Sequence, residues 1–188
     1  PHDFDRMCEN FRTMPKATIA VIEGRAGGGG SELALACDMR FAMRGGAVFN
    51  QPEVALGIVP GAGGTVRLPR LIGRSRALEV ILGSNDIDAD TAEKWGWVNR
   101  TLDGDALWPF VDDLAARIAK FPAAAVAAAK ESVLRADGDL IPDLLRESGA
   151  FNRLLANPDS RTAMQNFLAR GGQTVEGESR LGALAGEL

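Results

Sequence analysis

Histidine and cysteine are almost missing from this sequence. His2 is the single histidine, and Cys8 and Cys37 are the only cysteines, far apart and outside any CxxC motif. Zinc sites need these residue types clustered at short spacing, so the sequence predicts no metal site. The single His2 is not expected to support a serine triad unless a partner residue is missing upstream, and no G-x-S-x-G motif is present. Sparse cysteine favours a reducing compartment, and we expect a cytoplasmic protein.

Long hydrophobic runs and an excess of positive charge are also missing. The longest apolar stretches, such as 18–22, are far shorter than the roughly 20 residues that cross a bilayer, and no basic-then-apolar leader opens the chain. With 21 basic and 25 acidic residues, the formal net charge is −4. This balance offers no general positive field for a polyanion. We therefore expect no membrane and no nucleic-acid partner.

The composition that is present is typical of a soluble globular domain. The chain has 188 residues, of which 46% are hydrophobic and 24% charged, and its mean hydropathy is −0.04. That length suffices for one domain with its own core. The first residue is Pro1 rather than methionine. Because a natural chain begins with Met or at a processing site, we expect this chain to be part of a longer protein.

Apolar spacing predicts strands mixed with helices up to about residue 103 and helices alone after it. The expected helices cover 2–14, 31–39, 65–82 (with a break near Gly73), 88–95, 106–120, 123–135, 139–156 and 160–169, and the expected strands cover 17–23 and 97–102. Asp88 is placed to cap its helix, and Gly96 to end it. A glycine-rich turn over 25–30 and a loosely held tail over 171–188 complete the pattern, which favours an α/β core under a helical C-terminal layer.

The glycine run 27–30 stands between a predicted strand and a predicted helix, and Ser31 and Glu32 follow it. Exposed amides at a helix N-terminus suit a phosphate or a developing oxyanion. A P-loop would need Lys followed by Ser or Thr here, and a dinucleotide fingerprint would need its third glycine; neither is present. Two interpretations remain: an oxyanion site, and glycines that only let the helix approach the strand.

Glu32 and Glu53 are the acidic residues best placed for chemistry. Glu32 lies at the mouth of the glycine turn before an apolar run, and Glu53 lies in the sequence Asn-Gln-Pro-Glu-Val. Two carboxylates near oriented amides would suit moving protons around a polarised carbonyl. The structural alternatives are a capping glutamate and a solvated loop residue.

Arginine and tryptophan give two further expectations. Arg67, Arg70 and Arg74 follow i, i+3, i+7 spacing and would share a helical face, which could meet an anionic ligand tail or serve as a solvated face or subunit contact. The tryptophans, Trp95, Trp97 and Trp108, are expected in the core.

Most of residues 16–135 resembles the crotonase, or enoyl-CoA hydratase/isomerase, superfamily. The segments that carry the resemblance are 18–26 (TIAVIEGRA), 27–42 (GGGGSELALACDMRFA), 49–73 (FNQPEVALGIVPGAGGTVRLPRLIG), 86–99 (DIDADTAEKWGWVN) and 127–133 (AAAKESV). The resemblance implies an α/β fold of repeated ββα turns that form a superhelix, with the N-terminal turns missing from this chain. It divides the chain into a core over 1–135 and a C-terminal helical assembly region and tail over 136–188.

The resemblance also implies site residues and a reaction. Glu32 and Glu53 match the two catalytic glutamates of the family, Gly29 matches a glycine that donates an oxyanion-hole amide, and Gly61 matches a loop glycine whose amide helps hold the catalytic water. The implied enzyme is an enoyl-CoA hydratase, a lyase that adds water across the double bond of a 2-enoyl-CoA thioester. No separate cofactor is implied, because coenzyme A is part of the substrate.

Other members of the family leave alternatives open. The chain would otherwise be an enoyl-CoA isomerase, a retro-aldol or thioester-hydrolysing enzyme, or a catalytically silent scaffold. The second oxyanion amide and much of the coenzyme A pocket would come from the missing turns, so this chain alone is expected to be inactive. The sequence over 167–172 also departs from the basic segment of the family, which puts coenzyme contacts there in doubt.

Assembly is the last expectation. An apolar stripe runs along the predicted helices over 139–169, formed by Leu140, Leu144, Leu145, Phe151, Leu154 and Leu155. Large apolar patches usually mark an interface, although the stripe could also fold back on its own core. With the family resemblance, the stripe predicts a homotrimer or a hexamer of trimeric units.

Overall fold

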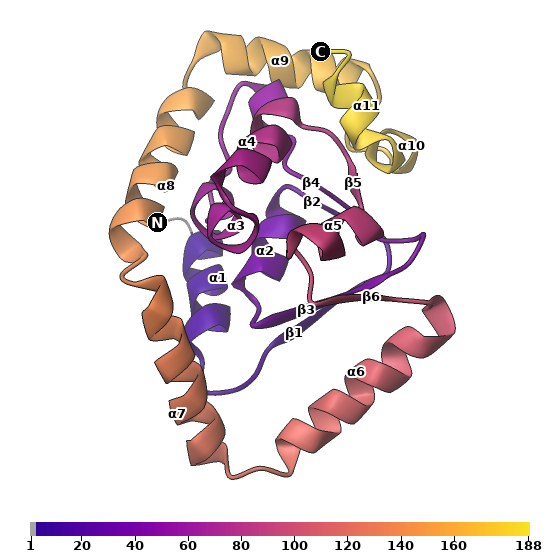
Figure 1. Cartoon of the computed structure of the whole chain (residues 1–188). Helices are drawn as coiled ribbons and strands as arrows, with labels where there is room; N and C mark the ends of the chain where they lie inside the picture. Colours follow the sequence, from indigo (N-terminus) through magenta and orange to yellow (C-terminus); the bar gives the residue numbers. More distant parts are fainter. Residues whose placement is uncertain (1–2) are drawn as a thin grey trace.

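The computed structural model describes residues 3–188, so the expectations on His2 lie outside the described part of the chain. In Figure 1, strands and short helices form a central body, and the helices that follow residue 103 run around its outside. No strand follows β6 (Arg100–Leu102) in the described residues, as the apolar spacing predicted. The same described residues include no helix that is both long and apolar enough to cross a bilayer.

Two small sheets, each of three strands, form the body. The first is parallel and holds β1 (Ile19–Ile22), β3 (Met39–Met43) and β6 in that order; the second holds β2 (Arg25–Gly27), β4 (Val48–Asn50) and β5 (Ile87–Asp88). β2 pairs parallel to β4, and β5 pairs antiparallel to it. The sequence predicted only a glycine turn over 25–30, but its first half forms β2, because its backbone pairs with the distant β4.

The chain passes through the two sheets in repeated turns. β1 and β2 are followed by α2 (Gly29–Ala36), and β3 and β4 are followed by the 3-10 turn η1 (Glu53–Leu56) and α3 (Gly64–Ile72). Each turn gives one strand to each sheet and then a helix, which is the ββα repeat that the resemblance implied. The helix α1 (Asp3–Thr13) precedes the first turn and packs on α2.

The main core cluster draws its residues from both sheets and from the helices of the body. Phe49 and Trp97 are fully buried there, with ring centroids 5.4 Å apart, and Trp95 packs against their cluster. Trp108 corrects the expectation of three core tryptophans. It is 45% exposed on α6 (Gly104–Ala119), and its indole donates to the carboxylate of Glu23 at 3.0 Å. An amphipathic indole can lie half in water when its N–H finds an acceptor.

Helix boundaries follow local signals where those signals are strong. Asp88 caps α5 (Ala89–Trp95) by accepting from the amide of Thr91 at 2.7 Å, and Gly96 ends the helix with φ 85°, both as predicted. Gly73, with φ 81°, separates α3 from α4 (Arg74–Gly83). The expected common face of Arg67, Arg70 and Arg74 is therefore wrong for Arg74, which begins the next helix.

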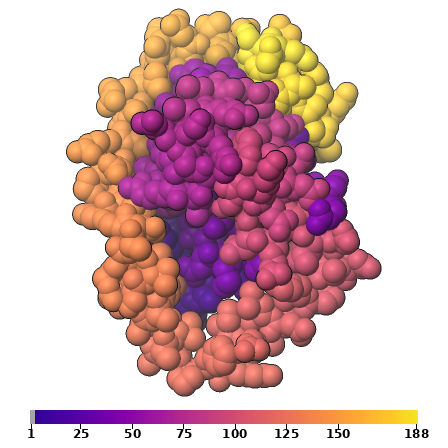
Figure 2. Space-filling model, viewed as in Figure 1, coloured from indigo at the N-terminus to yellow at the C-terminus, as the bar shows by residue number. Residues whose placement is uncertain are grey.

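The C-terminal helices wrap around the body, along one side and then across its top (Figure 1). They are α7 (Ala123–Leu134), the short η2 (Arg135–Asp137), α8 (Ile141–Leu155), α9 (Pro158–Ala169), α10 (Val175–Ser179) and α11 (Leu181–Ala185). Figure 2 shows α7 and α8 in orange along one side, α9 in lighter orange across the top, and α6 in pink at the lower edge of the other side. The prediction of a loose tail was wrong, because Leu181 and Leu184 are buried against Phe167 and hold α11 in place.

Candidate active site

The four residues that the resemblance singled out line one cavity. Gly29, Glu32, Glu53 and Gly61 all contribute to its wall, and the cavity volume is about 680 Å³. They come from α2, η1 and the loop between η1 and α3. Apolar side chains from both ends of the chain complete the wall, among them Phe4, Phe151, Phe167 and Leu181. The cavity therefore joins two carboxylates to an apolar lining.

Glu32 lies in the first turn of α2, and its carboxylate is held by backbone amides. Its side chain is only 4% exposed, and Oε1 accepts from the amides of Ala62 at 2.8 Å and of Gly64 at 2.9 Å. Burial raises the pKa of Glu32 to about 7, the two amides lower it, and the negative charge of Glu147 adds to the rise. Near neutral pH this carboxyl group can therefore both accept and release a proton.

Glu53 is the first residue of η1 and faces the same cavity in a drier setting. It is 7% exposed, and its Oε2 has no hydrogen-bond partner within residues 3–188. Burial first, and then the charge of Glu32, raise the pKa of Glu53 to about 8. Because two coupled carboxyl groups titrate close to neutrality, one can carry a proton while the other is ionised.

The glycine run before α2 brings backbone against the glutamates. Gly28 has φ 53°, and a Cβ there would lie 3.0 Å from Oε1 of Glu53. Gly29 is the first residue of α2, and no side chain caps the helix there. The amides of a first helical turn have no partner inside the helix, so they are available to an oxyanion in the cavity. Gly28 therefore fits the close-packing interpretation, because its backbone lies against Glu53. The oxyanion site at Gly29 stays a prediction.

The loop before α3 contains partners of Glu32 that the sequence did not indicate. Gly61 lies against α8, where a Cβ would be 2.8 Å from the ring of Phe151. The amides that bind Glu32 belong to the next residues, Ala62 and Gly64. The only available signal was the density of glycine and proline over 51–64, which predicts an ordered loop with unusual backbone angles.

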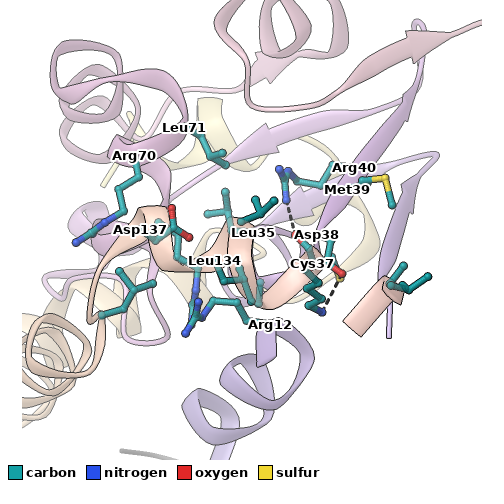
Figure 3. Close-up of a pocket in the computed structure, with 17 residues that line it drawn as sticks. Arg12, Leu35, Cys37, Asp38, Met39, Arg40, Arg70, Leu71, Leu134 and Asp137 are labelled. Atoms are coloured by element: carbon teal, nitrogen blue, oxygen red, sulfur yellow. Dashed lines mark hydrogen bonds and ion pairs between the residues drawn. The ribbon is translucent and has the colours of Figure 1, made fainter. Parts of the chain in front are cut away.

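Arg67 and Arg70 do not line the cavity of the glutamates. They line a second cavity, of about 410 Å³, between α7 and the C-terminal end of α2 (Figure 3). Arg67 is 5% exposed and pairs with Glu9 at 3.1 Å, and Arg70 pairs with Asp143 at 3.2 Å. Both arginines therefore already have carboxylate partners, and their contact with an anionic ligand tail stays a prediction.

No group of three or more His, Cys, Asp or Glu side chains within residues 3–188 is arranged to hold a metal ion. Cys8 and Cys37 are unpaired thiols, and burial raises the pKa of Cys8 to about 11. A thiol with so high a pKa is a poor nucleophile at neutral pH.

Comparison with known proteins decides the family. The family model described as enoyl-CoA hydratase/isomerase matches residues 2–177. This chain belongs to the enoyl-CoA hydratase/isomerase family. Among its relatives, the short-chain-enoyl-CoA hydratase of Clostridioides difficile is 44% identical over 153 residues, which cover 81% of this chain and 97% of that protein. The enoyl-CoA isomerase/hydratase fer4 of Mycosarcoma maydis is 37% identical over 88% of this chain.

Solved structures of the family share the fold. An enoyl-CoA hydratase from Mycobacterium avium subsp. paratuberculosis is 30% identical and has a TM-score of 0.82, over 86% of this chain and 68% of that one. A structure from Streptomyces avermitilis is 40% identical, with a TM-score of 0.96 over 99% of this chain and 67% of that one. The crotonase fold is thereby confirmed. The chain spans only 61% of the length of fer4.

Proposed function

We propose that the protein carrying this chain is an enoyl-CoA hydratase, which adds water to a 2-enoyl-CoA thioester. The observation that carries the proposal is the pair Glu32 and Glu53, two buried carboxyl groups with raised pKa values on one cavity. Keeping two such groups buried is costly without a use for their protons. Coenzyme A would enter as part of the substrate, and no separate cofactor is proposed.

The geometry supports a division of labour between the glutamates. The amide of Gly29 would donate to the thioester oxygen and so draw electron density from the double bond. Glu32, held by Ala62 and Gly64, would orient the water and take its proton while the water oxygen bonds to C3. Glu53 has the higher pKa and would give its proton to C2 as the enolate collapses. Gly61 is proposed to help hold that water through its amide.

Hydration of crotonyl-CoA is the direct test. The complete natural protein should remove the enoyl absorbance of crotonyl-CoA and form the 3-hydroxyacyl thioester, because both glutamates face the cavity. A 3-enoyl-CoA substrate supplies the control for isomerase activity. If the protein converted only the 3-enoyl isomer, the proposed activity would be isomerase rather than hydratase. If a calorimetric titration with acyl-CoA showed no saturable heat, the protein would be a scaffold without catalytic activity. This 188-residue chain alone should be inactive.

We also propose that residues 136–188 form an assembly region on the core of residues 1–135 and support a trimer or a hexamer. Ile141, Leu145 and Leu155 of α8 are 47–48% exposed in the single chain. Leu140, by contrast, is 2% exposed and belongs to the chain's own packing. The apolar stripe is thus divided between the core and an available surface. We also propose a cytoplasmic location, because the two cysteines are unpaired thiols, as is usual in a reducing compartment.

Leu145→Asp is expected to dissociate the oligomer without unfolding the chain. Leu145 is 48% exposed in the single chain, so a carboxylate there remains in water in the monomer but would be buried in an interface. Each apolar side chain buried on assembly contributes roughly 1.5–3 kcal/mol, so losing one per subunit should move light scattering toward the monomer mass. Leu82→Asp, at a 63% exposed site on α4, serves as the matched control. A wild-type protein that is an active monomer at low micromolar concentration would contradict the proposal.

A further inference from the structure

Four consecutive amides at the start of α3 point alternately to two carboxylates. Those of Ala62 and Gly64 donate to Glu32, at 2.8 and 2.9 Å. Those of Gly63 and Thr65 donate to Glu147, the second at 2.7 Å. The hydroxyl of Thr65 also donates to Glu147. The segment over 62–65, called the loop below although its last two residues begin α3, is therefore clamped between one carboxylate from the proposed active site and one from the C-terminal layer.

Glu147 lies outside the cavity, so it does not meet a substrate there. It belongs to α8, is 6% exposed and is not among the residues that line the cavity of Glu32 and Glu53. Burial raises the pKa of Glu147, and its hydrogen bonds and Arg67 oppose that rise. Within residues 3–188, its hydrogen-bond donors are the amides of Gly63 and Thr65 and the hydroxyl of Thr65, so this buried acid holds that loop.

A change at Glu147 would reach Glu32 through rigid peptide groups. Adjacent peptide planes in the loop carry the bonds to the two glutamates, and each plane is stiff. The carbonyl of Ala62 accepts from Nη1 of Arg67 at 2.6 Å. This carbonyl shares a peptide plane with the amide of Gly63, so that plane is held by Arg67 on one side and by Glu147 on the other. There is little room to adjust, because a Cβ on Gly64 would lie 3.1 Å from Glu32 Oε1 and 2.7 Å from Pro60.

We propose that Glu147 is a positioning residue, which fixes the loop over 62–65 so that the amides of Ala62 and Gly64 hold the carboxylate of Glu32 in its working orientation. The kinetic part of this inference rests on the proposed hydratase function. The C-terminal layer thereby has a second use beside assembly, since α8 carries Glu147 to the active-site loop.

The charge of Glu147 gives the proposal a distinct signature. The charged groups that act with it are Glu32 of α2, Glu53 of η1 and Arg67 of α3. The negative charge of Glu147 raises the pKa of both Glu32 and Glu53. Its removal should therefore lower both pKa values, and both limbs of the pH profile should move to lower pH. A loss of packing alone would lower the rate without moving the limbs together.

Kinetics of Glu147→Gln in the complete natural protein test the proposal. We expect kcat for crotonyl-CoA hydration to fall about 10- to 100-fold, the range for a reacting group displaced by about 1 Å, with KM nearly unchanged. Glu147→Asp keeps the charge and should restore the pH limbs and part of the rate. Glu79→Gln removes an exposed glutamate of α4 and should change neither. Unchanged kcat and unchanged limbs in Glu147→Gln would overturn the inference.

Crystal structures supply a readout that needs no activity. In Glu147→Gln we expect the Ala62 or Gly64 amide to move at least about 0.5 Å from Glu32, the tolerance of a working site. If both bonds to Glu32 keep their length while only Gly63 and Thr65 move, Glu147 does not position Glu32. If Glu147→Gln fails to fold, Thr65→Val removes only the hydroxyl donor and should give a smaller displacement of the same amides. If the Ala62 or Gly64 amide moved in Glu147→Gln but the wild-type protein hydrated no enoyl-CoA, the proposed function would be refuted and the positioning role of Glu147 would stand.

Discussion

Glu32→Gln should reduce kcat for hydration of crotonyl-CoA by about 10²–10⁴-fold, the usual contribution of a positioned acid or base. Glutamine cannot take a proton from water, but its amide oxygen can still accept from Ala62 and Gly64, so the loop is expected to keep its place. Steady-state kinetics of the complete natural protein, with circular dichroism to confirm the fold, make the measurement.

Glu79→Gln is the matched control for this change. It makes the same chemical substitution at an exposed position of α4, away from the cavity, and should keep wild-type rates. If Glu32→Gln retained activity within about threefold of the wild type, the assignment of Glu32 as the base would be wrong, because so small a loss lies below any general-base contribution.

Glu53→Gln should raise the stability of the fold at alkaline pH while it removes activity. The pKa of Glu53 rises from 4.5 to about 8 on folding, so the folded protein holds a proton that the unfolded chain loses. The contribution of Glu53 to the free energy of unfolding is fully present below pH 4.5 and is lost as the pH rises toward 8. At about 1.4 kcal/mol per pH unit, the loss reaches an upper value of about 4–5 kcal/mol at high pH. A neutral glutamine at position 53 does not ionise, so the variant avoids this loss of stability.

Urea denaturation at about pH 5 and about pH 9 would measure this effect. The free energy of unfolding of the wild type should fall across the interval, and Glu53→Gln should flatten the fall. Glu32, with a pKa of about 7, contributes in the same direction and leaves a residual slope in that variant. Equal slopes in wild type and Glu53→Gln would show that Glu53 ionises normally in the folded state.

Together the two variants would show a trade of stability for activity. Glu32 and Glu53 are 4% and 7% exposed, and burial is the largest cause of both raised pKa values. Side chains that only stabilised the fold would not need to be ionisable at buried positions. Increased stability with lost activity is the pattern expected where a site is built for chemistry.

The sequence by itself determined the features that depend on neighbours along the chain. The cap at Asp88, the left-handed end at Gly96 and the break at Gly73 each follow from one residue and its own backbone. The ββα order and the family follow from contiguous motifs, and all four residues taken from those motifs line one cavity. Their catalytic roles remain predictions.

Only the tertiary structure decided which distant groups meet. β2 exists because the residues over 25–27 pair with β4, and α11 is held because Leu181 and Leu184 reach Phe167. Glu147 lies 82 positions beyond Thr65 along the chain, so no spacing rule could connect them. The physical reason is the same in each case: hydrogen bonds, burial and pKa shifts depend on distance in space, which local propensity does not contain.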